Sequence, residues 1–145
     1  IEANITLLSG MMAPIGEDYS TLESIAETGG VRRDGTWPAN EEMARSMAVL
    51  AENAGIGMIT LHAGFIPEDD SNPERGVMIE RLQKIADIFA REGLCLALET
   101  GQESAEALLG ILVAIDRPRV GVNFDPANMV LYGSGDPIEA MEILS

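Results

Sequence analysis

Basic residues and long apolar runs are both scarce in this chain of 145 residues. Nine Lys and Arg stand against 24 Asp and Glu, which gives a formal net charge of -15. Binding to nucleic-acid phosphates needs clustered cations, so we expect no nucleic-acid partner. No apolar run approaches the roughly 20 residues of a membrane-spanning helix, so we expect no membrane association.

Cysteine and lysine occur once each, and each scarcity excludes a kind of chemistry. Cys95 cannot form a disulfide within the chain, which fits a reducing cytoplasm, and its apolar neighbours indicate a core residue. Lys84 falls within a predicted helix, so none of the predicted strands carries a lysine that could form a Schiff base. We therefore expect a cytoplasmic protein whose chemistry uses other side chains.

What the chain does contain is a regular alternation of short apolar runs with segments of helical period. The apolar runs predict four strands, at residues 3–10, 57–64, 94–100 and 120–126. Helical spacing predicts helices over 40–55, 78–93 and 105–115 and from 136 onward, with a weak helix at 21–27 inside a long connection, 11–39. Alternation of this kind is typical of an α/β fold made of parallel βαβ units.

Three of the predicted strands finish on polar residues that share one phase. Side chains alternate across a strand, so every second residue belongs to one phase and points to one face of the sheet. In these strands one phase is large and apolar, whereas the other is small or polar. The second phase finishes on His62, Glu99 and Asp125. Parallel strands end at one edge of a sheet, where α/β folds place their sites, so we expect these side chains to lie together.

Two of these residues are carboxylates, which predicts a metal site. Neighbouring strands lie about 4.8 Å apart, so Glu99 and Asp125 can reach one divalent ion through oxygen ligands at about 2.0–2.2 Å. Two carboxylates this close repel one another unless a cation lies between them. Each residue also has a simpler interpretation: Glu99 as a solvated loop-edge residue, Asp125 as part of an Asp-Pro turn, and His62 as a hydrogen-bonded core histidine.

Three segments resemble a known family: TLHAG (60–64), LALETG (96–101) and VGVNFDPANMVLYGSGDP (120–137). They are similar to the xylose isomerase-like TIM-barrel superfamily, and within it to the sugar phosphate isomerase/epimerase group. The resemblance implies a (β/α)8 barrel of which the four strands here are the third to sixth. Because the chain begins at Ile1 and stops at Ser145 within a predicted helix, we expect residues 1–145 to be one partial domain, roughly half a barrel, truncated at both ends.

The resemblance also implies roles for the polar residues. In this family a glutamate closing the fifth strand and an aspartate closing the sixth bind the metal, and they match Glu99 and Asp125. The fifth-strand glutamate also transfers a proton, so Glu99 is the expected catalytic residue. His62 matches a fourth-strand histidine that faces the substrate. The implied cofactor is a divalent ion: Mn²⁺, Mg²⁺, Co²⁺ or Zn²⁺.

These roles predict an isomerase or epimerase of a sugar or sugar phosphate. A base takes the proton next to a carbonyl and a cation holds the oxygens of the resulting enediolate. Asn128 stands where the endonuclease IV-like branch has a histidine, and an amide is a poor zinc ligand but a good hydroxyl-binding group. We therefore expect Asn128 to bind substrate, and a metal-dependent phosphodiesterase is disfavoured.

Trp37, in the long connection, is predicted to cover an apolar sugar face or to be a packing anchor.

A different class of function stays open, namely a binding or structural half-barrel that does no chemistry. Half a barrel exposes two sheet edges, and such edges promote pairing with another chain. The corresponding hypothesis is a homo-oligomer in which two copies close an eight-stranded barrel.

Overall fold

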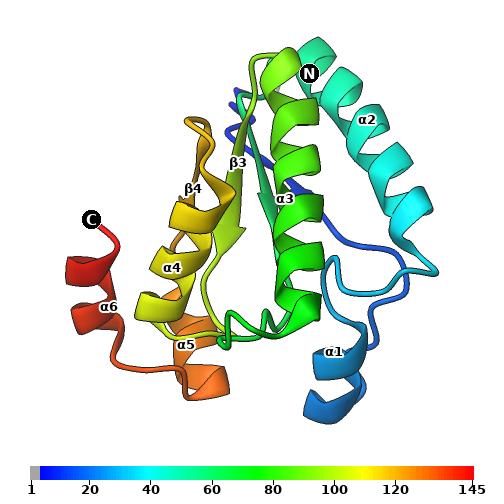
Figure 1. Cartoon of the computed structure of the whole chain (residues 1–145). Helices are drawn as coiled ribbons and strands as arrows, with labels where there is room; N and C mark the ends of the chain where they lie inside the picture. Colours follow the sequence, from blue (N-terminus) through cyan, green and yellow to red (C-terminus); the bar gives the residue numbers. More distant parts are fainter. Residues whose placement is uncertain (1–3) are drawn as a thin grey trace.

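The computed structural model describes residues 4–145 as one parallel sheet with its three longest helices packed on one face (Figure 1). The strands are β1 (Gly10–Met12), β2 (Met58–Leu61), β3 (Cys95–Glu99) and β4 (Val120–Asn123), in the spatial order β1-β2-β3-β4. The helices are α1 (Leu22–Thr28), α2 (Trp37–Ala54), α3 (Pro73–Arg91), α4 (Ala105–Ile115), α5 (Pro126–Tyr132) and α6 (Pro137–Ile143). The predicted α/β class with parallel (β/α) units is confirmed.

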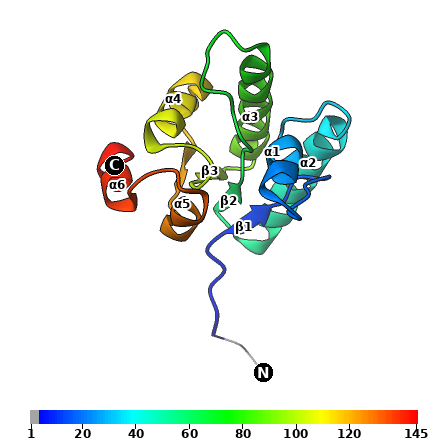
Figure 2. The same ribbon diagram turned by 90° about the horizontal axis from the view of Figure 1, so that it is seen from below.

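The two faces of the sheet differ as the phases predict. One row of register partners carries the large apolar side chains that pack against the helices: Met12, Leu61, Leu98 and Val122. The row beside it, whose side chains point to the opposite face, is formed by Met11, Thr60, Ala97 and Gly121. Figure 2, seen from the end at which the strands finish, shows α2, α3 and α4 gathered on one side of the strands.

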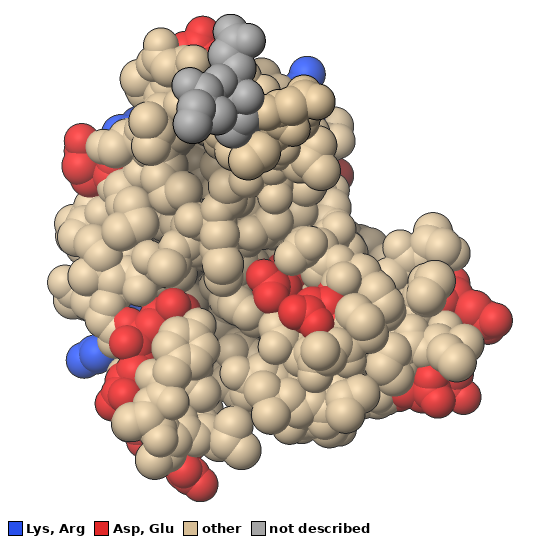
Figure 3. All heavy atoms as spheres, turned by 180° about the vertical axis from the view of Figure 1, so that it is seen from behind, with Lys and Arg blue, Asp and Glu red and all other residues tan. Residues whose placement is uncertain are grey.

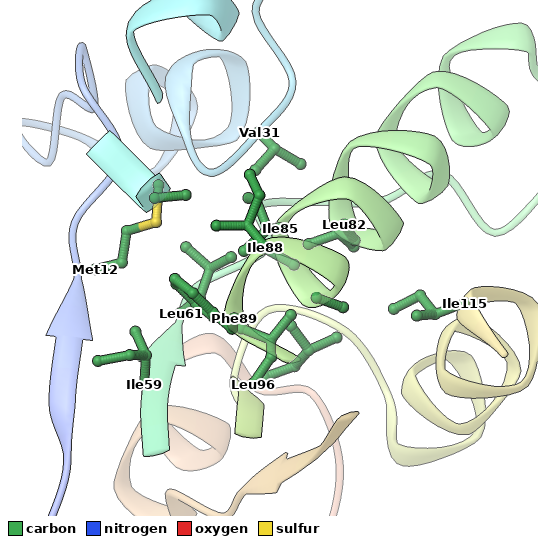
Figure 4. Packing of buried hydrophobic residues seen from close by; sticks show 14 of the residues in the cluster. Met12, Val31, Ile59, Leu61, Leu82, Ile85, Ile88, Phe89, Leu96 and Ile115 are labelled. Carbon is green, nitrogen blue, oxygen red and sulfur yellow. The ribbon is translucent and has the colours of Figure 1, made fainter. Parts of the chain in front are cut away.

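The core lies between the sheet and α3. A stripe along α3 is fully buried: Met78, Leu82, Ile85 and Phe89 are each 0% exposed. Figure 4 shows Phe89 beside Leu61 and near Leu96 of the sheet. Burying these side chains contributes roughly 1.5–3 kcal/mol each, so the α3–sheet contact is a large part of the folding free energy. None of the helices in the described residues has the length and apolarity needed to cross a membrane.

Two predicted strands are displaced or shortened in the structure. The first forms only at Gly10–Met12, because those residues pair with β2; residues 4–9 have no strand partner within the described chain, and residue 3 of the predicted run lies outside it. The last strand ends at Asn123, since Asp125 and Pro126 start a helix, α5, that the sequence pattern did not predict. Proline suits a first helical turn and cannot donate to a strand ladder.

Helix α2 begins three residues before its predicted N-cap. Pro38 occupies its first turn, and Asn40 is 1% exposed, accepting a hydrogen bond from the Ile15 N–H at 2.7 Å. Leu50, which the helical spacing places on the buried face, is 68% exposed. The predicted stop at Gly55 is confirmed, with φ of 69° in the left-handed region.

The long connection between β1 and α2 is held to the core by hydrogen bonds. Arg81, a buried residue of α3, donates from Nη1 to the Val31 carbonyl at 2.8 Å and to the Arg32 carbonyl at 2.7 Å, and pairs with Asp34. Charge-assisted bonds of this kind offset the cost of burying a guanidinium. The Val31 N–H also donates to the Ala63 carbonyl at 3.1 Å, which places the connection beside the end of β2.

Gly30 is where the long connection packs most closely against Ala63, directly after β2 and His62. Its replacement tests how much this contact contributes to stability. Its φ is 67°, and a Cβ there would lie 1.9 Å from the Ala63 carbonyl oxygen. We expect Gly30→Ala to lower the free energy of unfolding by about 2–4 kcal/mol, because a strained backbone and a clash add together. Urea unfolding measures this change.

Gly57→Ala is the matched control, because no heavy atom lies within 4 Å of its added Cβ. We expect this variant to differ from the parent chain by less than about 0.5 kcal/mol. Equal unfolding free energies for Gly30→Ala and the parent would contradict the packing described.

Candidate functional site

Three of the predicted site residues meet at the ends of the strands. Glu99 is the last residue of β3, His62 directly follows β2, and Asn128 lies in the first turn of α5. The Asn128 Nδ2 group donates to Glu99 Oε1 at 3.0 Å, and His62 Nε2 lies 3.4 Å from the same oxygen. The side chains of His62 and Glu99 are only 10% and 12% exposed. This cluster is therefore a preorganised polar site at the edge where β2 and β3 finish.

Asp125 has a different position from the one predicted. It lies two residues beyond the end of β4 and is the N-cap of α5, where its Oδ1 accepts from the N–H groups of Ala127 at 2.8 Å and Asn128 at 3.0 Å. This is the Asp-Pro turn that the sequence left open, extended into a helix cap. Its carboxylate thus orients the backbone that carries Asn128, and its role as a metal ligand stays a prediction.

Thr100 links the end of β3 to this turn, and the sequence analysis did not single it out. The residue is 2% exposed, and its hydroxyl accepts from the Asp125 N–H at 2.7 Å and donates to the Asp125 carbonyl at 3.1 Å. Its own N–H donates to the Asn123 carbonyl at 3.0 Å. The only available signal was a hydroxyl directly after Glu99, which alone does not reveal a partner 25 residues away.

Trp37 is not brought to this cluster. Its ring packs against the core at the start of α2, with the Arg81 guanidinium carbon 5.2 Å and the Lys84 Nζ 5.9 Å from the ring centroid. Cations over an indole ring stabilise helix packing through cation–π attraction. The structure thus places Trp37 in the packing role that the sequence left open, between α2 and α3.

Glu103 is a second residue that sequence reasoning missed. It lies in the segment between β3 and α4, and although the residue is partly exposed, burial of its carboxyl group raises its pKa to about 7. Nothing in the sequence indicated this burial, because desolvation of a side chain depends on tertiary packing and not on local spacing.

The donor set suits a hard divalent cation but is incomplete within the described chain. Carboxylate oxygens are the ligands that Mg²⁺ and Mn²⁺ prefer. Among residues 4–145, no group of three or more His, Cys, Asp and Glu side chains is arranged to hold a metal ion. Glu99 and Asp125 stay predicted ligands, and a closed metal site would need further donors.

One face of the molecule carries acidic side chains beside a hollow (Figure 3). Figure 3 shows the face of the sheet away from α2, α3 and α4, with a hollow toward the end where the strands finish. Acidic side chains lie on both sides of this hollow, whereas Lys and Arg appear only at the margin of the view (Figure 3). An accessible hollow with negative flanks favours cations and uncharged polar ligands over anions.

Comparisons with known proteins place this geometry in a family. The family described as xylose isomerase-like TIM barrel matches residues 34–144. A crystal structure of a xylose isomerase domain protein from Planctomyces limnophilus is 34% identical with a TM-score of 0.90, over 96% of this chain and 50% of that one. No curated protein sequence matches the chain.

Two further solved structures have the same architecture at lower identity. A D-tagatose 3-epimerase-like protein is 25% identical with a TM-score of 0.63, over 77% of this chain and 45% of that one. A xylose isomerase-like TIM barrel protein from Mycobacterium smegmatis in complex with magnesium is 18% identical with a TM-score of 0.71, over 94% of this chain and 47% of that one. The chain spans about half the length of these structures, so the predicted half-barrel fold is confirmed.

The hydrogen bonds of Thr100 can be tested by an isosteric change. Thr100→Val removes both bonds to Asp125 while keeping the shape of the side chain. We expect the free energy of unfolding to fall by about 1–3 kcal/mol, because the Asp125 N–H loses its acceptor. Chemical denaturation measures this loss. Thr60→Val is the matched control, since the Thr60 hydroxyl makes only a long contact of 3.5 Å to the Gly10 carbonyl. An equal loss of unfolding free energy in the two variants would contradict the stabilising role of the Thr100 hydrogen bonds.

The raised pKa of Glu103 predicts a pH dependence of stability. A carboxyl whose folded pKa, about 7, exceeds its ordinary value of 4.5 stabilises the fold fully below pH 4.5, and this contribution is lost as pH rises through 7. We expect Glu103→Gln to gain about 1–2 kcal/mol relative to the parent between pH 5 and pH 8. Unfolding free energies across this range measure the difference. Glu106→Gln, at an exposed position, is the control, and parallel pH profiles for Glu103→Gln and the parent would refute the prediction.

Proposed function

Because the chain belongs to the xylose isomerase-like TIM-barrel family, we propose that it carries part of the active site of a metal-dependent sugar isomerase or epimerase. The observation that carries this proposal is the convergence of His62 and Asn128 on one oxygen of the Glu99 carboxylate. A carboxylate held in this way at the end of a barrel strand lies where TIM-barrel enzymes place their chemistry.

Glu99 is the proposed base. Among the contacts of the described residues, both polar neighbours engage Oε1, which leaves Oε2 for the substrate. Oε2 takes the proton from the carbon next to the carbonyl, the electron pair of that C–H bond forms a carbon–carbon double bond, and the carbonyl π pair moves onto the carbonyl oxygen, which gives an enediolate. Return of the proton to the former carbonyl carbon, together with transfer of the neighbouring hydroxyl proton to the former carbonyl oxygen, gives the isomer. The carboxylate is preorganised for this transfer because Asn128 restricts its rotation.

Asn128 and His62 contact Glu99, and we propose that they also bind the substrate. An amide and an imidazole can each donate to and accept from hydroxyl groups, which suits a polyhydroxylated ligand. Thr100 and Asp125 act as positioning residues, because they hold the first turn of α5 against the end of β3.

A divalent ion would be held in part by Glu99 and by Asp125, whose Oδ1 already caps α5. When bound, such an ion would stabilise negative charge that develops on the substrate oxygens. Support for a metal comes from the carboxylate donor set and from the magnesium in the mycobacterial structure of the same fold. Support for sugar epimerisation comes from the D-tagatose 3-epimerase-like relative.

A phosphodiesterase of the endonuclease IV type is disfavoured by two observations. Asn128 occupies the histidine position of that branch and here bonds to Glu99. The net charge of -15 also opposes the approach of nucleic acid. A half-barrel that only binds is the remaining alternative, and metal binding distinguishes it from the enzyme.

Manganese titration tests the proposed metal site. We expect the chain to bind Mn²⁺ and both Glu99→Gln and Asp125→Asn to weaken binding by at least about tenfold, because each removes a charged ligand. Asparagine can still cap α5, so Asp125→Asn separates metal binding from folding. Electron paramagnetic resonance of free Mn²⁺ measures the affinity.

Glu139→Gln, at an exposed position on α6, is the control for loss of one negative charge. Its Mn²⁺ affinity should equal that of the parent chain. Equal affinity in the parent and in Glu99→Gln, or no binding by the parent, would rule out the proposed site.

A further inference from the structure

Asn123, the last residue of β4, is the register partner of Glu99 in the sheet. On the other side of Glu99 stands His62, because it directly follows the Leu61–Leu98 pair of β2 and β3. Neighbouring strands lie about 4.8 Å apart, so His62, Glu99 and Asn123 form one row across three strands. This row places a further polar side chain next to the carboxylate, on the β4 side.

The side chain of Asn123 belongs to the face of the sheet that the long helices leave open. Val120 and Val122 pack against the hydrophobic core on the helix side. Side chains alternate along a strand, so Asn123 points the other way, to the same face as Gly121. A Cβ added at Gly121 would meet no heavy atom within 4 Å. Among the described residues, this face therefore has free space beside Asn123 in which a ligand of Glu99 can lie.

The amide of Asn123 is free, unlike the two other polar side chains beside Glu99. Asn128 Nδ2 donates to Glu99 Oε1 at 3.0 Å, and His62 Nε2 lies 3.4 Å from that oxygen. Within residues 4–145 the half-buried side chain of Asn123 makes no hydrogen bond, whereas its backbone carbonyl accepts from the Thr100 N–H at 3.0 Å. The backbone is thus held in place while the amide N–H groups stay available to a bound molecule.

The described residues supply no cationic side chain to the segments in which these strands end. The connections between β2 and α3, between β3 and α4, and between β4 and α5 contain no Lys or Arg. The reaction proposed for Glu99 places negative charge on the carbonyl oxygen of the substrate. A preorganised neutral amide stabilises such charge where it develops, as the asparagine of an oxyanion hole does.

We propose that Asn123 is a further catalytic residue of the Glu99 site, where its Nδ2 group donates to the carbonyl oxygen of the substrate as that oxygen becomes negatively charged. This oxygen lies two bonds from the carbon that Glu99 deprotonates, and one strand spacing separates the two residues, so one ligand can contact both. Glu99 receives the proton and Asn123 loses none; its hydrogen bond strengthens as the oxygen gains charge. This inference rests on the proposed function and names the side chain that holds the enediolate.

Nuclear magnetic resonance of the whole chain tests this role, because its single histidine, His62, lies beside Glu99 and is not itself changed. The probes, titrated with Mg²⁺ present, are dihydroxyacetone, which has a ground-state carbonyl, and glycolohydroxamate, a planar mimic of an enediolate. We expect both to shift the His62 signal saturably. In the parent chain glycolohydroxamate should bind more tightly, since a site that stabilises developing charge binds its mimic better than the ground state.

Two variants of different size remove the amide. We expect Asn123→Leu and Asn123→Ala each to weaken glycolohydroxamate binding by about tenfold or more and dihydroxyacetone binding by no more than about threefold, because hydrogen bonds to charged acceptors are the stronger ones. Asn53→Leu is the matched control, since the Asn53 amide is exposed on α2 and donates only to the Val49 carbonyl. Its affinities should equal those of the parent. Mn²⁺ affinity should stay unchanged in all three variants, because Nδ2 cannot bind a metal ion.

Each other outcome overturns a defined part. Unchanged glycolohydroxamate affinity in the Asn123 variants, or an equal loss for the two probes, overturns the role of Asn123 and leaves the proposed function standing. Weaker Mn²⁺ binding in these variants also overturns it, because the side chain would then be a metal ligand. The absence of any shift at His62 with either probe overturns this inference together with the substrate-binding part of the proposed function, whereas the Mn²⁺ titration judges the metal site separately.

Discussion

The parallel pairing of β3 with β2 on one side and β4 on the other is the constraint on which the site depends. Leu61 pairs with Leu98, and Glu99 pairs with Asn123, so the three strands finish within a residue of one another. Parallel strands in register bring residues that are far apart in sequence to a common edge. His62 and Glu99 meet for this reason, although 37 positions separate them along the chain.

The site also depends on how the turns after the strands are held. Thr100 connects β3 to the α5 cap, and Asp125 directs the turn that carries Asn128 to Glu99. On the other flank, Arg81 binds the long connection whose Gly30 contacts Ala63. Both flanks are therefore built from hydrogen bonds between loops and the rigid sheet or α3, an arrangement that fixes side chains more closely than free loops do.

Acidic charge has two separate consequences in this molecule. Distributed over the surface, it opposes anionic partners such as nucleic acid. At the end of β3 it supplies one carboxylate, Glu99, whose neighbours are an imidazole and an amide. The first effect follows from composition, whereas the second follows from which few side chains are brought together.

The sequence by itself determined the strand–helix alternation, the alternation of side chains along the strands, and the position of His62 and Glu99 at one edge. These follow from periodicity and parallel topology, which are local or rule-governed properties. The place of Asn128 beside Glu99 was implied only by the family resemblance. The sequence did not determine the length of β1, the helix α5, the packing of Trp37 under Arg81, the hydrogen bonds of Thr100 or the burial of the Glu103 carboxyl. An apolar run becomes a strand only where a partner pairs with it, and a hydroxyl or carboxyl acquires its role only from neighbours and desolvation. Those depend on contacts between distant segments, so only the tertiary structure decided them.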